Sequence, residues 1–192
     1  MAIKSLCLIL YNAVMSKFGT HFVIYGPTGS GKSTLARQIS RQTGLPHIEL
    51  DAIYWLPGWQ GKPLEQYRSD ISAKLSQCPQ GWICDGNYSQ VRDLILPLAD
   101  TVIWLRPPYP VALWRLVKRT FARSRNREML WGTNSESLRK TFFSRDSLLL
   151  FQITHWAKYN KIGQNINKYQ HHATVIQLHS TKEIETFIRE LS

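Results

Sequence analysis

The feature that most constrains the fold is an eight-residue loop, Gly26-Pro27-Thr28-Gly29-Ser30-Gly31-Lys32-Ser33, which matches the pattern G-x-x-x-x-G-K-[ST]. Residues 21–25 before it form a short apolar run that predicts a buried strand, and residues 32–43 after it have apolar side chains at helical spacing. A strand that leads through this loop into a helix is the context in which the pattern binds phosphate. The alternative, a glycine-rich turn without a ligand, leaves the lysine unexplained in a site that is already positive.

The residue types of this loop suit a nucleoside triphosphate. The glycines permit backbone angles and close approaches that a Cβ atom forbids, so that successive N–H groups can point at phosphate oxygens. The helix adds its positive end, Lys32 adds a mobile charge, and the hydroxyl of Ser33 suits Mg²⁺. We therefore expect ATP to be bound by Gly26, Pro27, Thr28, Gly29, Ser30, Gly31, Lys32, Ser33 and Thr34.

Strand and helix patterns alternate along the rest of the chain. Further strands are predicted at 47–50, 82–84, 101–105 and 174–178, and further helices at 64–75, 91–98, 111–122 and 136–158. Ser180, with Glu183 three residues later, is a capping-box pattern that predicts the start of a final helix. This alternation predicts an α/β fold in which parallel strands form an open sheet with helices on both faces.

Two aspartates follow predicted strands and should reach the carboxyl edge of the sheet, where the phosphate loop lies. Asp85 follows the apolar run 82–84, and we expect it to hold Mg²⁺ together with Ser33. Asp51 ends the second strand, and two roles remain open for it, activating an acceptor hydroxyl or helping to hold the metal. Glu49 lies two residues earlier on the same face as a substitute for Asp51. Both aspartates could instead be ordinary turn or cap residues.

Four segments of the sequence resemble the adenylate-kinase-like P-loop proteins often called "DNA topology modulation protein". They are 26–34, 50–59 (Leu-Asp-Ala-Ile-Tyr-Trp-Leu-Pro-Gly-Trp), 85–88 (Asp-Gly-Asn-Tyr) and 99–105 (Ala-Asp-Thr-Val-Ile-Trp-Leu). The resemblance implies a P-loop NTPase with a nucleoside-monophosphate-kinase-like fold, an open five-stranded parallel sheet and a mobile lid.

The same resemblance assigns roles to two arginines. Arg115 and Arg119 match the Arg-x-x-x-Arg pair that enters the lid of adenylate kinases, which implies that Arg115 packs on adenine and Arg119 contacts phosphate. A solvated helix face is the alternative, because residues four apart share one side of a helix. Ser89 stands where adenylate kinases have an arginine for the acceptor's phosphate, with Arg92 one helical turn later, which favours a hydroxyl-bearing acceptor. Arg106 stands where the family has an acid.

The net charge of +11 is concentrated in one segment. Residues 106–145 contain ten basic and two acidic residues, which indicates a segment that holds an anion. We expect an arginine-rich lid at about residues 119–138 that closes over ATP. Arg119 and Arg123 are the arginines expected to contact phosphate, with Arg127 and Arg139 behind them.

The arginine-rich segment also has two other interpretations. Trp114 and Trp131 lie close to it in the sequence, so it could bind nucleic acid through phosphate contacts and base stacking. It could also be an ordinary solvated surface.

Other features limit the class of protein. The three cysteines, Cys7, Cys78 and Cys84, fit neither a disulfide framework nor a zinc site, so we expect no structural metal and a cytoplasmic location. No apolar run approaches the ~18 residues of a membrane-spanning helix. We expect a single domain at 20–192 after an N-terminal extension at 1–19. That extension could be a signal peptide, an amphipathic helix or a non-native start with Met15 as the alternative first residue.

Together these patterns favour an ATP- and Mg²⁺-dependent phosphotransferase that transfers the γ-phosphoryl group of ATP to a small-molecule or nucleotide acceptor. Its expected catalytic residues are Lys32, Asp51, Asp85, Arg119 and Arg123. Tyr54, Trp55 and Trp59 either line the acceptor pocket or serve packing. The alternative is an ATP-binding regulatory protein that binds DNA and modulates topology or transcription, although the sequence has no helix-turn-helix or zinc-finger pattern. The sequence leaves the oligomeric state open.

Overall fold

A computed structural model describes residues 16–126, 128–132, 134–135, 156 and 172–191. Its central sheet consists of β1 (His21–Tyr25), β2 (His47–Glu49), β5 (Trp82–Asp85), β6 (Thr101–Leu105) and β9 (Thr174–Leu178). The helices are α2 (Lys32–Thr43), α3 (Leu50–Tyr54), α4 (Leu64–Ser76), α5 (Arg92–Ile95), α6 (Tyr109–Arg125) and α10 (Thr181–Glu190). Two short hairpins pair β3 (Trp55–Leu56) with β4 (Gln60–Gly61), and β7 (Met129–Leu130) with β8 (Asn134–Ser135).

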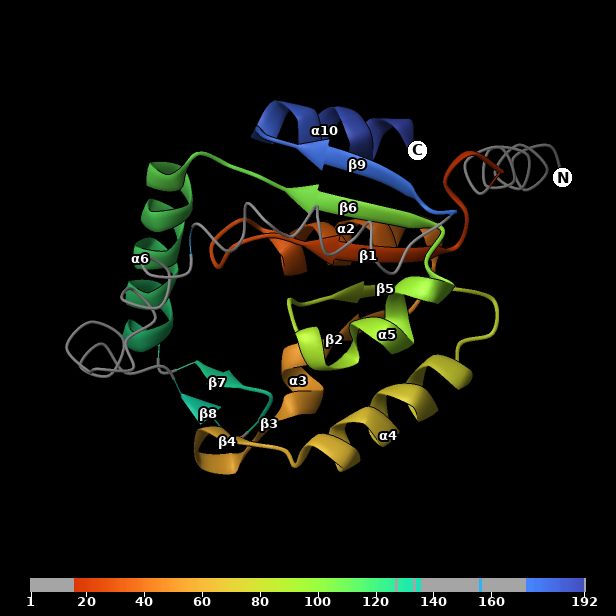
Figure 1. The fold of residues 1–192 in the computed structure, drawn as a ribbon. Coiled ribbons are helices and arrows are strands. Elements are labelled where there is room, and N and C mark those ends of the chain that lie inside the picture. The colour runs from red at the N-terminus through yellow and green to blue at the C-terminus, as the bar shows by residue number, and fades with distance from the viewer. Residues whose placement is uncertain (1–15, 127, 133, 136–155, 157–171, 192) are drawn as a thin grey trace, which may run out of the picture.

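The five strands of the central sheet are parallel and lie in the order β2-β5-β1-β6-β9 (Figure 1). Strand β1 is in the middle, so the loop that follows it is flanked by the loops after β5 and β6. In open parallel sheets, ligands bind at the carboxyl ends of the strands. This arrangement confirms the expected α/β fold with a five-stranded parallel sheet.

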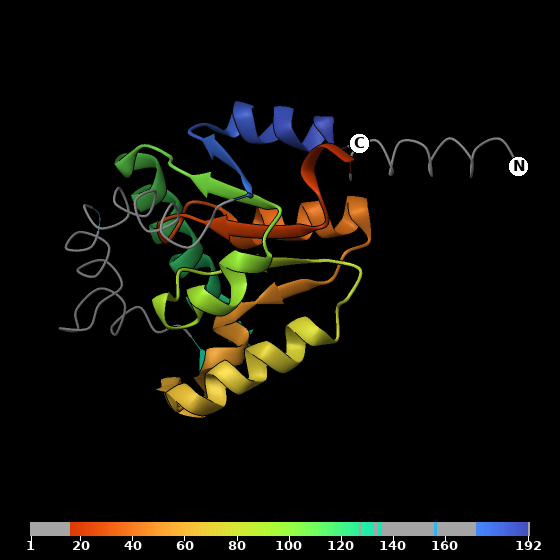
Figure 2. The same cartoon turned by 45° about the vertical axis from the view of Figure 1, so that its right-hand side comes forward.

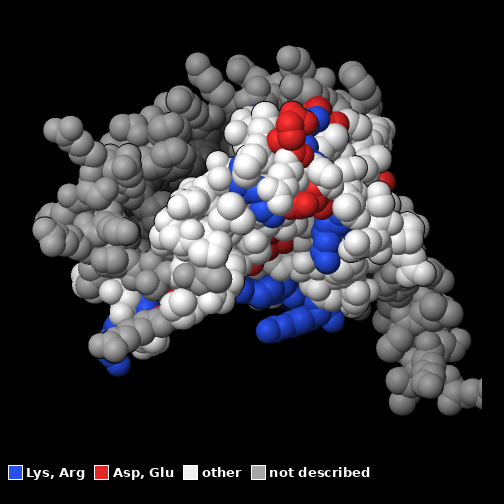
Figure 3. All heavy atoms as spheres, turned by 90° about the horizontal axis from the view of Figure 1, so that it is seen from below, with Lys and Arg blue, Asp and Glu red and all other residues white. Residues whose placement is uncertain are grey.

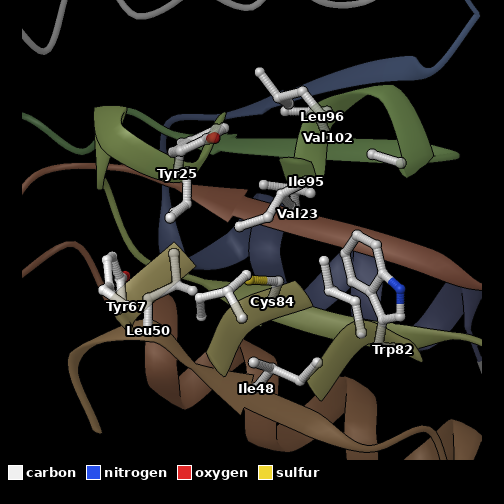
Figure 4. Close-up of a cluster of buried hydrophobic side chains, with 14 of the residues drawn as sticks. Val23, Tyr25, Ile48, Leu50, Tyr67, Trp82, Cys84, Ile95, Leu96 and Val102 are labelled. Carbon is white, nitrogen blue, oxygen red and sulfur yellow. The ribbon is translucent and has the colours of Figure 1, made fainter. Parts of the chain in front are cut away.

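Side chains alternate between the two faces of the sheet, and both faces are buried. On one face Val23 and Tyr25 pack in a cluster with Ile95 of α5 (Figure 4). Ile71 of α4 belongs to the same cluster. On the other face Phe22, Ile24 and Ile103 pack with three helical residues, Leu35 and Ile39 of α2 and Phe187 of α10. Strands covered on both faces are nearly continuous apolar runs. The prediction of helices on both faces is therefore confirmed.

Helix α6 stands at the carboxyl edge of the sheet, beside the phosphate loop (Figures 1 and 2). The two elements are in close contact at Gly29, where an added Cβ atom would lie 2.2 Å from the carbonyl oxygen of Ala112. The φ angle of Gly29 is 79°, which also favours glycine. The loop can pack against α6 only because this position has no side chain.

Two predicted elements differ in the structure. The helix expected at 91–98 is broken into a 3-10 turn (Ser89–Val91), the short α5 and a second 3-10 turn (Leu96–Leu98), because Pro97 lacks the N–H that a continuous helix needs. The second strand ends at Glu49. Asp51 was expected to end this strand, but it lies in the first turn of α3. Helix α3 was not predicted from the sequence; its first residue, Leu50, is buried in the core cluster, and the helix contacts α4.

The expected lid segment begins within a helix. Arg119 and Arg123 lie in the last two turns of α6, which continues to Arg125 rather than ending near residue 122. Arginine is a good helix former, and a run of polar residues without apolar periodicity can therefore remain helical. The helix predicted at 136–158 lies outside the described residues apart from position 156, as do residues 1–15. Within the described residues, no helix is long and apolar enough to cross a membrane.

Candidate active site

The phosphate loop is fixed to the loop that follows β5 through the side chain of Asn87. Its amide nitrogen Nδ2 donates to the carbonyl oxygen of Gly26 at 2.6 Å, and its Oδ1 accepts the N–H of Gly26 at 3.3 Å. Within the phosphate loop, the N–H of Ser30 donates to the carbonyl of Pro27 at 3.1 Å, and Gly31 has a φ of 99°. The loop therefore has a compact form that depends on glycine and is held from outside by one amide.

Lys32 lies over this loop. Its Nζ donates to the carbonyl oxygens of Gly26 at 2.9 Å and Pro27 at 3.2 Å. Burial lowers the pKa of Lys32, while the charges of Asp85 and Asp51 act in the opposite direction and that of Arg119 adds to the lowering. Three other residues expected to be catalytic, Asp85, Asp51 and Arg119, therefore lie close enough to influence the charge of Lys32.

Ser33 and Asp85 meet below the loop. The hydroxyl of Ser33 donates to Oδ2 of Asp85 at 2.6 Å, and Asp85 has only 3% of its surface exposed. The other carboxyl oxygen, Oδ1, lies 2.7 Å from Nε2 of His47. His47 belongs to β2, the strand next to β5. Both oxygens of Asp85 therefore have a fixed partner.

Asp51 reaches the same region from α3. Its Oδ1 accepts a hydrogen bond of 2.6 Å from the hydroxyl of Tyr88. The ring of Tyr88 packs against Tyr54 at 4.8 Å and Tyr67 at 5.4 Å between ring centroids. Burial, followed by the charge of Asp51, raises the pKa of Tyr88, so its hydroxyl remains a donor to the carboxylate. The orientation of Asp51 is thus set by Tyr88 and the packing around it.

The hairpin β7–β8 touches the other acidic residue of this edge. The indole N–H of Trp131 donates to the carboxyl group of Glu49, and the Trp131 ring lies 5.8 Å from that of Trp59, centroid to centroid. Asn134 accepts the N–H of Trp59 at 3.0 Å and donates to the carbonyl of Leu56 at 3.1 Å. The hairpins β3–β4 and β7–β8 are therefore joined beside Glu49.

A cavity of about 220 Å³ lies between α6 and the start of α10. Ser30, Arg115 and Thr181 are among the residues that line it. Arg115 donates to the hydroxyl of Thr181 at 2.8 Å and to the carbonyl of Ser30 at 3.4 Å. The structure thus places Arg115 over a hollow next to the phosphate loop, whereas Thr34 is exposed on α2.

The remaining basic residues from the sequence lie in different places. Nε of Arg123 is 3.6 Å from Glu128, so the structure pairs this arginine with an acid. Arg127 and Arg139 lie outside the described residues. Arg106 stacks over the ring of Trp104 at 4.5 Å and donates to Gln177 at 3.1 Å, at the far side of β6 from Asp85. On the face shown in Figure 3, basic side chains are interspersed with acidic ones.

Three residues of this site received no role from the sequence. Asn87 and Tyr88 belong to the Asp-Gly-Asn-Tyr segment, whose position directly after a strand was a usable signal. The sequence around His47 indicates only a strand, because the adjacency of β2 and β5 is not apparent from the order of the strands along the chain.

Comparison with known proteins places the chain in a family. A model of the family "ATPase family associated with various cellular activities (AAA)" matches residues 22–78. The uncharacterized protein YqaC of Bacillus subtilis (strain 168) is 31% identical over 125 residues, which cover 65% of this chain and 70% of YqaC. The chain belongs to the YqaC family. An adenylate kinase of Symbiobacterium thermophilum is 29% identical to this member of the YqaC family over 131 residues, covering 54% of the chain and 61% of the adenylate kinase.

A solved structure is similar to this member of the YqaC family over a larger part of the chain than YqaC itself. The gluconokinase of Sinorhizobium meliloti 1021 superimposes with a TM-score of 0.53 at 18% identity, covering 91% of this chain and 90% of the gluconokinase. At this identity the likeness is one of fold, and the fold is that of a P-loop NTPase with kinase-like structural neighbours. The names of these similar proteins do not include "DNA topology modulation", and they give no support to the DNA-binding alternative.

The residues at the foot of the loop fit Mg²⁺. A serine hydroxyl and a carboxylate are the oxygen ligands that this ion takes from P-loop proteins, and it keeps several waters besides.

The hydroxyl of Ser30, in the phosphate loop, is fully buried without a hydrogen-bond partner, which is the kind of polar atom that a bound group satisfies. Among the described residues, no group of three or more His, Cys, Asp and Glu side chains is placed to hold a metal.

Proposed function

We propose that the protein is an ATP- and Mg²⁺-dependent phosphotransferase of the kinase type. The observation that carries the proposal is the 2.6 Å contact between the hydroxyl of Ser33 and Oδ2 of Asp85, whose charge also acts on the Lys32 ammonium group. Ser33 and Asp85 would hold Mg²⁺, which when bound neutralises charge on the phosphates of ATP. The cavity beside Arg115 would take the adenine ring.

In the proposed reaction a hydroxyl oxygen of the acceptor forms a bond to the γ-phosphorus of ATP. The bond between this phosphorus and the oxygen that bridges it to the β-phosphate breaks, and its electron pair leaves with ADP. Asp51 accepts the proton of the acceptor hydroxyl. Lys32 and Arg119 stabilise the charge on the transferred group, because most of the catalysis of phosphoryl transfer is positioning and electrostatic stabilisation.

Tyr88 supports the role of Asp51 as the base. Its hydroxyl holds Oδ1 of Asp51, which leaves Oδ2 as the oxygen that can receive a proton. Ser89 adds to this interpretation, since an arginine for an acceptor phosphate is missing at that position and Arg92 instead lies over the ring of Tyr25 at 5.6 Å.

The test separates transfer from ATP binding. Asp51→Asn is expected to lower acceptor-stimulated release of ADP by about 10²-fold or more, the size of a lost general base, while the dissociation constant for a non-hydrolysable ATP analogue stays within about twofold. Asp70→Asn, at a partly exposed acid of α4 that pairs with Lys62, is the matched control and should change neither. Equal losses in binding and transfer would instead make Asp51 a metal ligand or a structural residue.

A further inference from the structure

The acceptor side of the site is acidic. Glu49, Asp51 and Asp85 come from the neighbouring strands β2 and β5 and from α3. Burial raises the pKa of Glu49 first, and the charges of Asp85 and Asp51 raise it further. Glu49 lies opposite Asp85 in the register of β2 and β5, and Asp51 follows Glu49 by two residues in the first turn of α3. Together the three carboxyl groups oppose the entry of an anion.

Lys32 acts on Asp85 and Asp51, but its ammonium group is bonded to the carbonyl oxygens of Gly26 and Pro27. Three other basic side chains, beside or on α4 and α5, have contacts of their own. Lys62 donates to Asp70 at 2.6 Å, and Arg68 binds both carboxyl oxygens of Asp93, at 2.9 and 2.6 Å. Arg92 lies over the ring of Tyr25. Lys62 and Arg68 are therefore neutralised by acids of their own, whereas Arg92 keeps a buried Nε without a hydrogen-bond partner.

Aromatic rings stand beside the carboxylates. Trp131 donates to Glu49 and packs on Trp59, whose ring lies 5.6 Å from that of Trp55, centroid to centroid. All three tryptophans are half-buried. Indole rings next to carboxylates suit an uncharged ring compound, since its hydroxyls can donate to the carboxylates while its apolar face packs on indole.

We propose that the acceptor is an uncharged ring compound with several hydroxyl groups, a sugar or a nucleoside, and that Glu49 discriminates against its phosphorylated or carboxylated relatives. This inference rests on the proposed phosphotransferase function and narrows its acceptor. Glu49 acts here as a specificity-determining residue through its charge, and Asp51 remains the proton acceptor for every acceptor.

The experiment measures ADP release from MgATP with matched pairs of compounds. Monosaccharides and nucleosides are each compared with their own phosphomonoester, and glucose is also compared with gluconate. We expect kcat/KM for at least one neutral compound to exceed that of its anionic partner by about tenfold or more. Equal or better use of the anionic partners would overturn this inference and leave the kinase proposal standing. If none of the compounds stimulates ADP release by protein that binds the ATP analogue, both this inference and the kinase proposal would be overturned.

Glu49→Gln sharpens the test. The amide removes the charge but keeps an oxygen that can accept the indole N–H of Trp131, so the hairpins remain joined. We expect the preference for the neutral partner to fall about tenfold, through a gain in kcat/KM for the anionic one. Glu65→Gln, at the exposed start of α4, is the matched control and should leave the preference unchanged. An unchanged preference in Glu49→Gln, with an unchanged Tm, would overturn the role of Glu49.

Discussion

Nε2 of His47 lies 2.7 Å from Oδ1 of Asp85, the carboxyl group whose other oxygen accepts the hydroxyl of Ser33. The histidine comes from β2 and the aspartate from the end of β5, and Asp85 is almost completely buried. A partner of this kind fixes the orientation of a metal-binding carboxylate, and the loss of such a partner typically weakens metal affinity by about 10- to 100-fold.

His47→Ala is therefore expected to raise the Mg²⁺ concentration needed for half-maximal ADP release by about tenfold. The reason is that Asp85 loses the contact that orients it, while Ser33 and Lys32 stay in place. His47→Gln retains a donor and should recover most of the affinity for Mg²⁺. A Mg²⁺ titration curve that does not move in His47→Ala would show that Asp85 needs no support from β2.

Lys32 places a charged group where burial lowers its pKa. A lowered lysine pKa means that folding disfavours the ammonium form, so the penalty is present at neutral pH and is relieved as the pH rises through the folded-state pKa. Lys32→Met should abolish transfer, with a loss of about 10²-fold or more in ADP release. The same change should leave the free energy of unfolding unchanged or raise it by up to about 1 kcal/mol, roughly 3 °C in Tm.

Lys74→Met is the control for this pair of measurements, because Lys74 is exposed on α4. It should alter neither transfer nor Tm. A clear fall in the Tm of Lys32→Met would mean that the bonds from Nζ to Gly26 and Pro27 stabilise the loop more than the buried charge destabilises it.

Alanine substitutions at Gly29 and Gly44 separate the effect of backbone strain on binding of the ATP analogue from the effect of a steric clash with α6. Both have left-handed backbones, with φ angles of 79° and 73°, so an alanine at either position costs about 1–2 kcal/mol. Only at Gly29 would the new Cβ atom also meet a carbonyl oxygen of α6, whereas the space around Gly44 is open. We expect Gly29→Ala to weaken binding of the ATP analogue at least tenfold and Gly44→Ala to leave it unchanged, as measured by calorimetric titration. Similar binding by both variants would contradict the close packing of the loop on α6.

Asp100 makes the stability of the sheet depend on pH. Its Oδ2 accepts bonds from the N–H groups of Thr20 and His21 at 2.8 and 2.9 Å, and from Nδ1 of His21 at 2.9 Å. Burial alone would raise the pKa of Asp100, but the bonds from His21 and from the backbone outweigh it and hold the pKa below the ordinary 3.8. A depressed carboxyl pKa stabilises the fold above the ordinary value, and that stability is lost as the pH falls through the folded-state value.

Asp100→Asn should therefore lower the Tm at pH 7 and flatten the fall in Tm between pH 5 and about pH 3. Thermal unfolding across this range measures both effects. Asp70→Asn removes a partly exposed acid that pairs with Lys62 on α4 and serves for comparison. If the Tm of Asp100→Asn falls between pH 5 and about pH 3 as much as that of the unchanged protein, other carboxyl groups are responsible for the pH dependence of stability.

The elements with a clear period were predictable from the sequence, and the short ones were not. Strands β1 and β6 and helix α2 were predicted with the bounds that the structure gives, because the two strands are short apolar runs and the apolar residues of α2 recur at a helical period. The hairpins have strands of only two residues and show no period. Trp59 and Trp131 even adopt positive φ angles of 63° and 51°, which residues other than glycine rarely do. Their conformation is set by contacts such as those of Asn134, which join segments 75 residues apart.

The candidate site was predictable as far as a motif or a strand end marks it. The phosphate loop, Asp85 and Arg115 follow from residue spacing and from the resemblance to a kinase family. The partners His47, Asn87 and Tyr88 depend on which strands are neighbours, and the sequence order of strands does not specify that. Arg123 had the residue type expected for phosphate, but the structure adds an acid beside it, Glu128.

Asn87 has a consequence for the energetics of nucleotide binding. By accepting the N–H and donating to the carbonyl of Gly26, it holds the first residue of the phosphate loop in place through protein contacts. A loop that is already ordered loses little conformational entropy when phosphate binds, so more of the interaction energy is expressed as affinity. The loop after β5 would thus favour the proposed nucleotide binding through preorganisation of the phosphate loop.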